Sequence, residues 1–223
     1  MILAELRAQV CAGNQQLFEA GLVVWTGGNL SARDPETGLV AIKPSGMQYG
    51  QMRAEDMVVL DLDGNIVDGV RGPSSDTASH LRIYRLRPEL RSIVHTHSNY
   101  ASAFAAAGMA IPCCLTAIAD EFGGPVPCGD YAPIGGTAIG DEVVRQLGRS
   151  PAILMKQHGV FTVGATIEKA IKAAVMVEDV AKTVSIAMGI GRVESLPAEE
   201  IAANFERYQQ RYGTGSASVG VRS

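Results

Sequence analysis

Between residues 29 and 65 the chain alternates short apolar segments with tight polar turns, and this pattern constrains the fold most strongly. Strand patterns at residues 29–33, 39–43 and 57–62 are separated or closed by turns rich in Asp, Pro, Gly and Asn. Turns this short join antiparallel neighbours, whereas parallel strands need a long crossover. The pattern therefore predicts two antiparallel hairpins and excludes an all-parallel sheet. No Gly-rich phosphate loop follows a strand, so a dinucleotide or ATP site is not expected.

The rest of the chain reads as helices and strands in alternation, which indicates a mixed α/β protein. A Gly- and Pro-rich stretch at residues 123–136 predicts a loop with at most one strand, and the small polar residues 213–223 predict a mobile tail. Helices are predicted at residues 2–20, 76–87, 98–107, 137–147, 165–188 and 197–211, and strands at 92–97, 111–116, 152–156 and 160–163.

Composition narrows the class of protein. Apolar residues make up 47% of the chain, which is enough for a full core, and the net charge of −4 argues against a nucleic-acid partner. Residues 98–119 carry no charge, but Gly108 and Pro112 interrupt them, so a membrane span is not expected. Glu5 and Arg7 give the first segment an amphipathic character unlike a signal peptide. With no C-x-x-C pair, the four cysteines predict free thiols, and together these features predict a cytoplasmic protein.

The histidines are few and two of them are closely spaced. His95 and His97 end an apolar strand pattern, so both side chains point to one face with Cα atoms about 6.6 Å apart. His158 follows a second apolar strand in a tight turn. If the two strands end on the same side of the sheet, three imidazoles can converge and leave one coordination position open, as in a catalytic zinc site. The alternative is that they are unrelated polar residues at strand ends. His80, inside a predicted helix, is interpreted as a solvated or packing side chain.

Two Ser/Gly clusters, residues 42–46 and 72–76, are candidate anion sites. The second cluster precedes a helix, where free backbone N–H groups and the helix dipole favour an anion. Serine hydroxyls and Lys43 could complete a phosphate cradle. Locally, a helix cap and a plain turn explain the same residues.

Five short motifs occur in the order and spacing of the class II aldolase/adducin family, which the chain resembles over about residues 1–190. Three features resemble the sugar-phosphate epimerases of the family more than its aldolases: Asp76 after the two serines, Ser98 after His97, and the pair Thr116 and Asp120. The motifs are Gly-Asn-Leu-Ser at residues 28–31, Ile-Lys-Pro-Ser-Gly at 42–46, Pro-Ser-Ser-Asp-Thr at 73–77, Val-His-Thr-His-Ser at 94–98 and His-Gly at 158–159.

The resemblance implies a three-layer α/β/α fold with a mainly antiparallel central sheet, formed by one domain over residues 1–212. It also implies a homotetramer with active sites between subunits, one divalent metal ion per subunit (zinc, with manganese or cobalt as alternatives) and a phosphorylated ketose as substrate. Asp76 beside the metal and Asp120 are the implied catalytic residues, and Thr116 and Tyr212 are further candidates. The implied metal ligands are His95, His97 and His158, and the implied phosphate-binding residues are Asn29, Lys43, Ser45, Gly46, Ser74 and Ser75.

The implied chemistry makes and breaks a C–C bond through an enediolate. If the aldehyde fragment turns and adds back, the enzyme is an epimerase, and if the fragment leaves, it is an aldolase or a related decarboxylase or dehydratase. Two departures leave the choice open: the chain is shorter than the epimerase pattern between residues 127 and 152, and no tyrosine follows Gly213. A non-catalytic module like the adducin head is a third alternative, against which the intact histidine set argues.

Overall fold

The computed structural model describes residues 1–211, in which eight strands form one sheet with the order β4-β3-β2-β1-β5-β8-β7-β6. Every neighbouring pair is antiparallel except β6 and β7, so the mainly antiparallel sheet is confirmed. The strands are β1 (Asn29–Arg33), β2 (Val40–Ile42), β3 (Val58–Leu60), β4 (Ile66–Asp68), β5 (Ser92–Thr96), β6 (Cys128–Gly129), β7 (Ala152–Met155) and β8 (Gly159–Gly164).

Helices cover both faces of the sheet. Successive side chains of a strand point to opposite sides, and in the central strands the apolar side chains on both sides need to be buried. Val94 and Val160 pack toward the layer that contains α1, α3, α4 and α6, whereas Ile93 and Phe161 pack toward α2 and α5. The helices are α1 (Ala4–Glu19), α2 (Thr77–Leu86), α3 (Asn99–Ala107), α4 (Thr116–Phe122), α5 (Ala138–Leu147), α6 (Ile167–Ile190) and α7 (Ala198–Arg211), with 3₁₀ turns at Tyr49–Gln51 and Ala54–Asp56.

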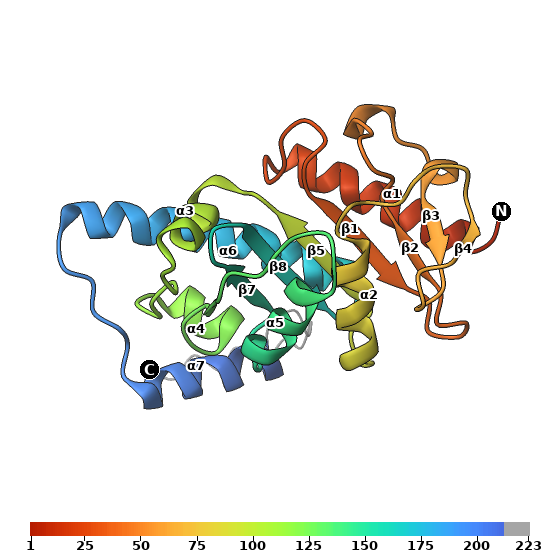
Figure 1. Ribbon diagram of the computed structural model, residues 1–223. Coiled ribbons are helices and arrows are strands. Elements are labelled where there is room, and N and C mark those ends of the chain that lie inside the picture. The colour runs from red at the N-terminus through yellow and green to blue at the C-terminus, as the bar shows by residue number, and fades with distance from the viewer. Residues whose placement is uncertain (212–223) are drawn as a thin grey trace.

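Strand β5 connects the two halves of the molecule. It pairs with β1 on one side and β8 on the other, and all of its residues are buried. Figure 1 shows β1 to β4 with α1 at one end of the molecule, and β7 and β8 with α3 to α7 at the other. A strand buried on both faces needs continuous apolar character, so the polar His95 within it requires a specific reason.

The helix boundaries follow local signals. Pro88 comes shortly after the end of α2, and α3 and α4 end at Gly108 and Gly123, whose φ angles of 66° and 67° lie in the left-handed region that favours glycine. Helix α6 begins after Thr166, whose hydroxyl oxygen accepts a hydrogen bond from the backbone N–H of Lys169.

The predicted strand at residues 111–116 is wrong. Only Ile111 forms a bridge, to Val126, and Thr116 already begins α4. Three side chains spaced by one and three residues, Ile118, Ala119 and Phe122, are buried together, which a helix allows and a strand does not. The predicted tail and Tyr212 lie outside the described residues.

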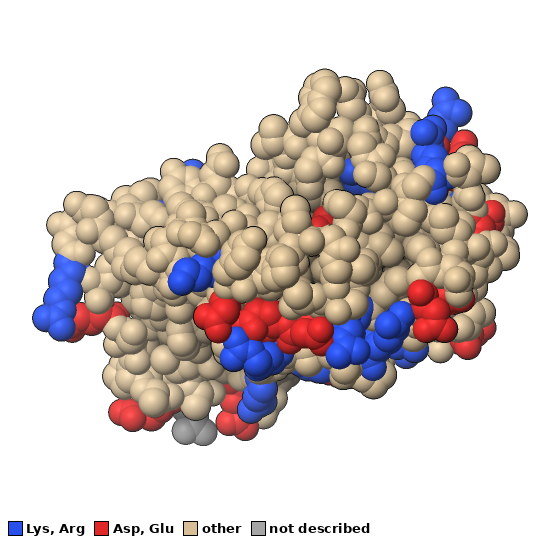
Figure 2. All heavy atoms as spheres, viewed as in Figure 1, with Lys and Arg blue, Asp and Glu red and all other residues tan. Residues whose placement is uncertain are grey.

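None of the helices within residues 1–211 combines the length and apolar character that a membrane crossing requires. On the face viewed in Figure 2, acidic and basic side chains mix along the lower edge, over α5 and α2. Arg82 of α2 pairs with Asp141 of α5, and Arg145 of α5 pairs with Asp130, with N–O distances of 2.6 and 2.8 Å.

Candidate metal centre and anion pocket

The three histidines come together where β5 ends and β8 begins. His95 lies in β5, His97 follows it, and His158 lies in the turn that joins β7 to β8. The antiparallel register sets Thr96 opposite Val160, so the last residue of β5 and the start of β8 lie at the same end of the sheet. One ring nitrogen from each histidine lies within 4.8 Å of the others. The predicted convergence of three imidazoles is therefore present in this subunit.

These residues fit one divalent metal ion. The His95 Nδ1 atom lies 2.9 Å from the carbonyl oxygen of Val160, which leaves Nε2 available for a metal. Nδ1 of His158 is buried and has no hydrogen-bond partner within the described part of the chain, an arrangement that a metal ion would satisfy. Burial lowers the pKa of His95 to about 3, against the opposing effect of Asp76, and partial desolvation by the pocket wall lowers the pKa of His97 and His158. Neutral imidazole is the form that binds metals.

Gly159 gives the imidazoles the room that this arrangement needs. A Cβ atom there would lie 2.6 Å from both Cδ2 of His97 and the carbonyl oxygen of Thr96. We expect Gly159→Ala to weaken metal binding about 10- to 100-fold by displacing the His97 ring, a loss typical of changes just outside a ligand shell. Competition with a chelator measures the affinity. Gly189→Ala is the matched control, because a Cβ at Gly189 meets nothing within 4 Å. Equal metal affinity in both variants would contradict the expectation.

The two Ser/Gly clusters lie side by side and form one wall of the same pocket. The backbone N–H of Ser45 donates to the carbonyl oxygen of Gly72, and that of Ser74 donates to the carbonyl oxygen of Lys43. Pro44 and Pro73 form a β-bridge between them. The two segments lie far apart in the chain but are joined by these contacts. A separate helix cap and a separate turn would not require such pairing.

Lys43 is the cation of this wall. Its side chain is only 2% exposed, and Nζ donates to the carbonyl oxygen of Thr26 at 2.9 Å. Within residues 1–211 it makes no ion pair with a carboxylate, although Asp76 is close enough to oppose the lowering of its pKa by burial. The partners of Lys43 are carbonyl oxygens and the ring of Tyr49, whose centroid lies 5.0 Å from Nζ, and a buried ammonium with such uncharged partners gains most from an anionic ligand.

Asn29 and Asp76 connect the cradle to the histidines. The Asn29 amide nitrogen donates to Oδ2 of Asp76 at 2.7 Å and to Oγ of Ser74 at 3.0 Å. Burial would raise the pKa of Asp76, but interactions with His95 and His80 and the Asn29 hydrogen bond outweigh it, so the net shift is downward. Asp76 is thus an ionised carboxylate beside the imidazoles.

One pocket of about 420 Å³ gathers every predicted metal and phosphate residue together with Asp76. Its lining also includes residues to which no role was assigned from the sequence pattern: Thr26 contributes its backbone carbonyl oxygen, and Ile134 and Gly135 come from the loop before α5. Tyr49 holds the glycine turn, because its hydroxyl donates to the carbonyl oxygens of Gly27 and Gly28 at 2.7 and 3.0 Å. Backbone contacts and loop placement leave no periodic signal, which is why these residues were missed.

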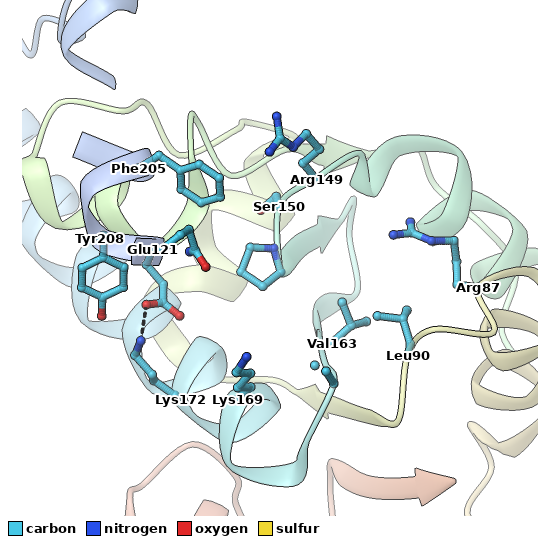
Figure 3. Close-up of a pocket in the computed structure, with 14 residues that line it drawn as sticks. Arg87, Leu90, Glu121, Arg149, Ser150, Val163, Lys169, Lys172, Phe205 and Tyr208 are labelled. Carbon is cyan, nitrogen blue, oxygen red and sulfur yellow. Dashed lines mark ion pairs between the residues drawn. The ribbon is translucent and has the colours of Figure 1, made fainter. Parts of the chain in front are cut away.

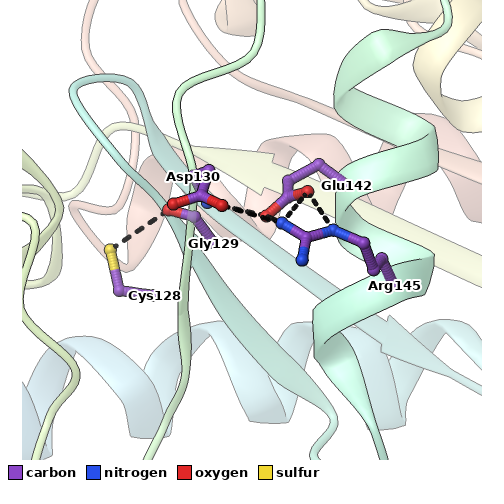
Figure 4. Close-up of polar contacts among 5 residues, drawn as sticks. All are labelled: Cys128, Gly129, Asp130, Glu142 and Arg145. Atoms are coloured by element: carbon purple, nitrogen blue, oxygen red, sulfur yellow. Dashed lines mark hydrogen bonds and ion pairs between the residues drawn. The ribbon is translucent and has the colours of Figure 1, made fainter.

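The loop that carries Ile134 is anchored at its start by a polar cluster (Figure 4). The backbone N–H of Asp130 donates to Glu142 Oε1 at 2.7 Å, and Arg145 bonds both Asp130 and Glu142. The individual ion pairs at this exposed place are weak, but several together fix one loop end on α5.

The other candidates lie elsewhere in this subunit. Asp120 and Thr116 are on α4 and do not line the pocket, and Asp120 instead pairs with Arg207 of α7 at 3.0 Å. Their catalytic roles stay predictions. His80 is fully buried, with Nδ1 2.7 Å from the Ser31 hydroxyl oxygen, so it is a packing histidine and not a solvated one.

Comparison with known proteins identifies the family. Residues 8–185 match the model of the class II aldolase and adducin N-terminal domain. The chain belongs to this family. An L-ribulose-5-phosphate 4-epimerase, UlaF, of Salmonella paratyphi C (strain RKS4594) is 44% identical over 203 residues, which cover 84% of this chain and 87% of that protein.

Solved structures of the class II aldolase family share the fold. An L-fuculose 1-phosphate aldolase superposes with a TM-score of 0.89 at 31% identity, covering 94% of this chain and 98% of its own. The L-fuculose 1-phosphate aldolase from Glaciozyma antarctica PI12 gives 0.77 at 25% identity, covering 92% and 81%. Because its relatives are an epimerase and class II aldolases, this chain is an enzyme, either an isomerase or a lyase.

Proposed function

We propose that this class II aldolase family member is an L-ribulose-5-phosphate 4-epimerase, which breaks and remakes a C–C bond through an enediolate. The observation that carries the proposal is the single pocket in which three imidazoles converge with a buried lysine ammonium and two serine turns. The 44% identity to an epimerase of that name supports the choice of substrate. A cytoplasmic location and a single domain over residues 1–212 stay predictions.

The pocket divides into a metal end and a phosphate end. His95, His97 and His158 would hold one divalent cation, and a three-histidine set with an open position favours zinc. When bound, that ion supplies Lewis-acid polarisation of the substrate carbonyl. The Lys43 ammonium and the hydroxyls and backbone N–H groups of the two serine turns would bind the phosphate, with Asn29, Ser45, Gly46, Ser74 and Ser75 around it.

Proton transfer needs two groups on opposite sides of the reacting bond. Asp76, whose carboxylate accepts a hydrogen bond from the Asn29 amide, would be the proton-transfer group on the metal side. Asp120 of a neighbouring subunit would accept the proton of the hydroxyl on the carbon whose configuration changes. The C–C bond then breaks into an enediolate and an aldehyde. When the aldehyde re-adds through its other face, its oxygen takes up a proton on that side, Asp120 releases the proton that it had accepted, and the product is the epimer.

The direct test incubates the metal-loaded protein with L-ribulose 5-phosphate and follows the mixture by NMR. Conversion to the 4-epimer supports the proposal. Net accumulation of glycolaldehyde phosphate and dihydroxyacetone, the two fragments on either side of the C3–C4 bond, would instead establish an aldolase, the alternative that the likeness to L-fuculose 1-phosphate aldolase favours. Unchanged substrate would exclude both for this sugar.

Replacing Lys43 separates binding from chemistry. We expect Lys43→Met to raise KM about 10- to 100-fold with a small change in kcat, because a charge-assisted contact remote from the reacting bond contributes equally to ground and transition states. Steady-state kinetics measure both constants, and Lys182→Met, an exposed lysine on α6, is the control. A fall in kcat at unchanged KM would contradict the assignment.

The tetramer with shared active sites belongs to this proposal. Large apolar side chains flank the pocket: Val24 and Trp25 precede the lining residue Thr26, and Tyr131 and Ile134 lie in the opposite loop, each more than 60% exposed. Exposed apolar groups concentrated at a site support its being covered by another subunit. We expect light scattering to give four chains per particle at micromolar concentration, and a monomer would remove the shared site.

A further inference from the structure

A second pocket, of about 390 Å³, lies at the opposite end of the strands that carry the histidines (Figure 3). Val163 and Gly164 at the end of β8 line it, whereas His158 precedes the start of the same strand. The five steps from Gly159 to Gly164 span about 17 Å. Among the described residues, the two pockets share no lining residue.

The charge in this pocket opposes that of the whole protein. The chain carries a net charge of −4, yet four basic residues line the pocket and Glu121 is its only acidic lining residue within the described chain. The basic residues are Arg87, Arg149, Lys169 and Lys172. Concentrated positive charge inside a concave site attracts anions more strongly than the same charge on a flat surface.

Two of the four cations are already compensated. Lys172 pairs with Glu121 at 2.7 Å, and Arg87 pairs with Glu89. Arg149 and Lys169 make no ion pair with any residue between 1 and 211. Figure 3 shows Lys169 projecting from α6 into the pocket, with Arg149 across from it. An incoming anion therefore meets two cations in the pocket wall that have no internal carboxylate partner to be displaced within the described chain.

The remaining walls suit the body of an organic molecule. Leu90 and Val163 are buried apolar side chains at the base, and Phe205 of α7 presents its ring beneath the Arg149 guanidinium, 5.7 Å from the ring centroid. Gly164 and Ala165 lie just before the start of α6, whose dipole adds to the positive potential. Apolar walls with a few convergent charged groups are the usual composition of a small-molecule site.

We propose that this pocket is a second ligand site, for a small organic phosphate whose apolar part packs against Phe205, Leu90 and Val163. Lys169 forms charge-assisted hydrogen bonds with the phosphate oxygens, and Arg149 on the opposite side of the pocket adds to the positive potential that attracts the anion. The inference uses no residue of the metal pocket and does not depend on the reaction proposed above.

The test measures binding of phenyl phosphate by isothermal titration calorimetry in a Lys43→Met background, which weakens the first anion site. We expect one equivalent to bind per subunit, and the added pair Arg149→Ala and Lys169→Ala to weaken that binding at least tenfold. The matched control adds Arg53→Ala and Lys182→Ala instead, which removes the same charge from exposed positions elsewhere. That control should bind as the background does.

Folding of the pocket variant is checked separately. With Lys43 restored, the Arg149→Ala and Lys169→Ala protein should keep the circular dichroism spectrum and the thermal unfolding temperature of the parent. The proposal is overturned if the Lys43→Met protein binds no phenyl phosphate, if the pocket pair leaves affinity unchanged, or if the control pair weakens it equally.

Discussion

The Asp120→Asn enzyme is expected to lose a factor of about 10² to 10⁴ in kcat, while metal content and fold stay unchanged. An amide of the same shape cannot accept the proton that a carboxylate general base accepts. Asp120 pairs with Arg207 near the surface, and an ion pair of this kind contributes about 0–1 kcal/mol, so a loss of stability would be small. Steady-state kinetics with matched metal analysis measure the effect.

Arg207→Ala distinguishes catalysis from structure. If Asp120 served only to hold α7 against α4, removing either partner of the ion pair would have the same effect. If Asp120 transfers the proton, Arg207→Ala should retain activity within about tenfold of the parent, since its effect is indirect. Asp179→Asn, an exposed carboxylate on α6, controls for the change in charge. Near-parent turnover by Asp120→Asn would remove the main support for the epimerase and make Asp76 the leading acid/base of an aldolase.

Removing one imidazole should abolish both metal binding and activity. We expect His97→Ala to hold much less than one equivalent of metal and to lose at least about 10³ in kcat/KM, because Lewis-acid stabilisation contributes several kcal/mol to the transition state. His97 is exposed in this subunit, so the change leaves the core intact. Elemental analysis after gel filtration gives the metal content, and circular dichroism reports folding.

Two further outcomes sharpen the His97 test. His158→Ala should reproduce the loss, since both rings belong to the same cluster. Addition of excess zinc should restore little activity, because the two remaining imidazoles do not supply the three protein ligands of a catalytic site. A purified, folded His97→Ala protein that keeps a full equivalent of metal would show that the assignment of ligands is wrong.

The convergence of the three histidines was predictable because much of its geometry is local. Two histidines separated by one residue share a face of any strand, and His158 follows a second apolar strand, so only the pairing of β5 with β8 had to be assumed. The early hairpins were predictable for the same reason, since short turns determine their neighbours.

Features that depend on long-range packing were not predictable from the sequence. Helix α4 was missed because the apolar run before it has the length and composition of a strand, and only burial of Ile118 and Phe122 against other elements decides between them. The Lys43 contact with the Thr26 carbonyl oxygen uses backbone, which every residue has. The cationic pocket collects Arg87, Arg149 and Lys169 from three separate elements.

The central place of β5 has a consequence for how the protein is made. β1 lies more than 60 residues before β5, and β8 more than 60 residues after it, so the pairings on both sides of β5 close long loops. Such contacts form slowly because their loop-closure entropy must be overcome first. A chain leaving the ribosome holds His95 and His97 early, but the third imidazole arrives only when synthesis has passed residue 158 and β8 has joined the sheet. Tight metal binding therefore follows the assembly of most of the sheet. An incompletely synthesised chain, which lacks the third imidazole, binds a metal ion only weakly.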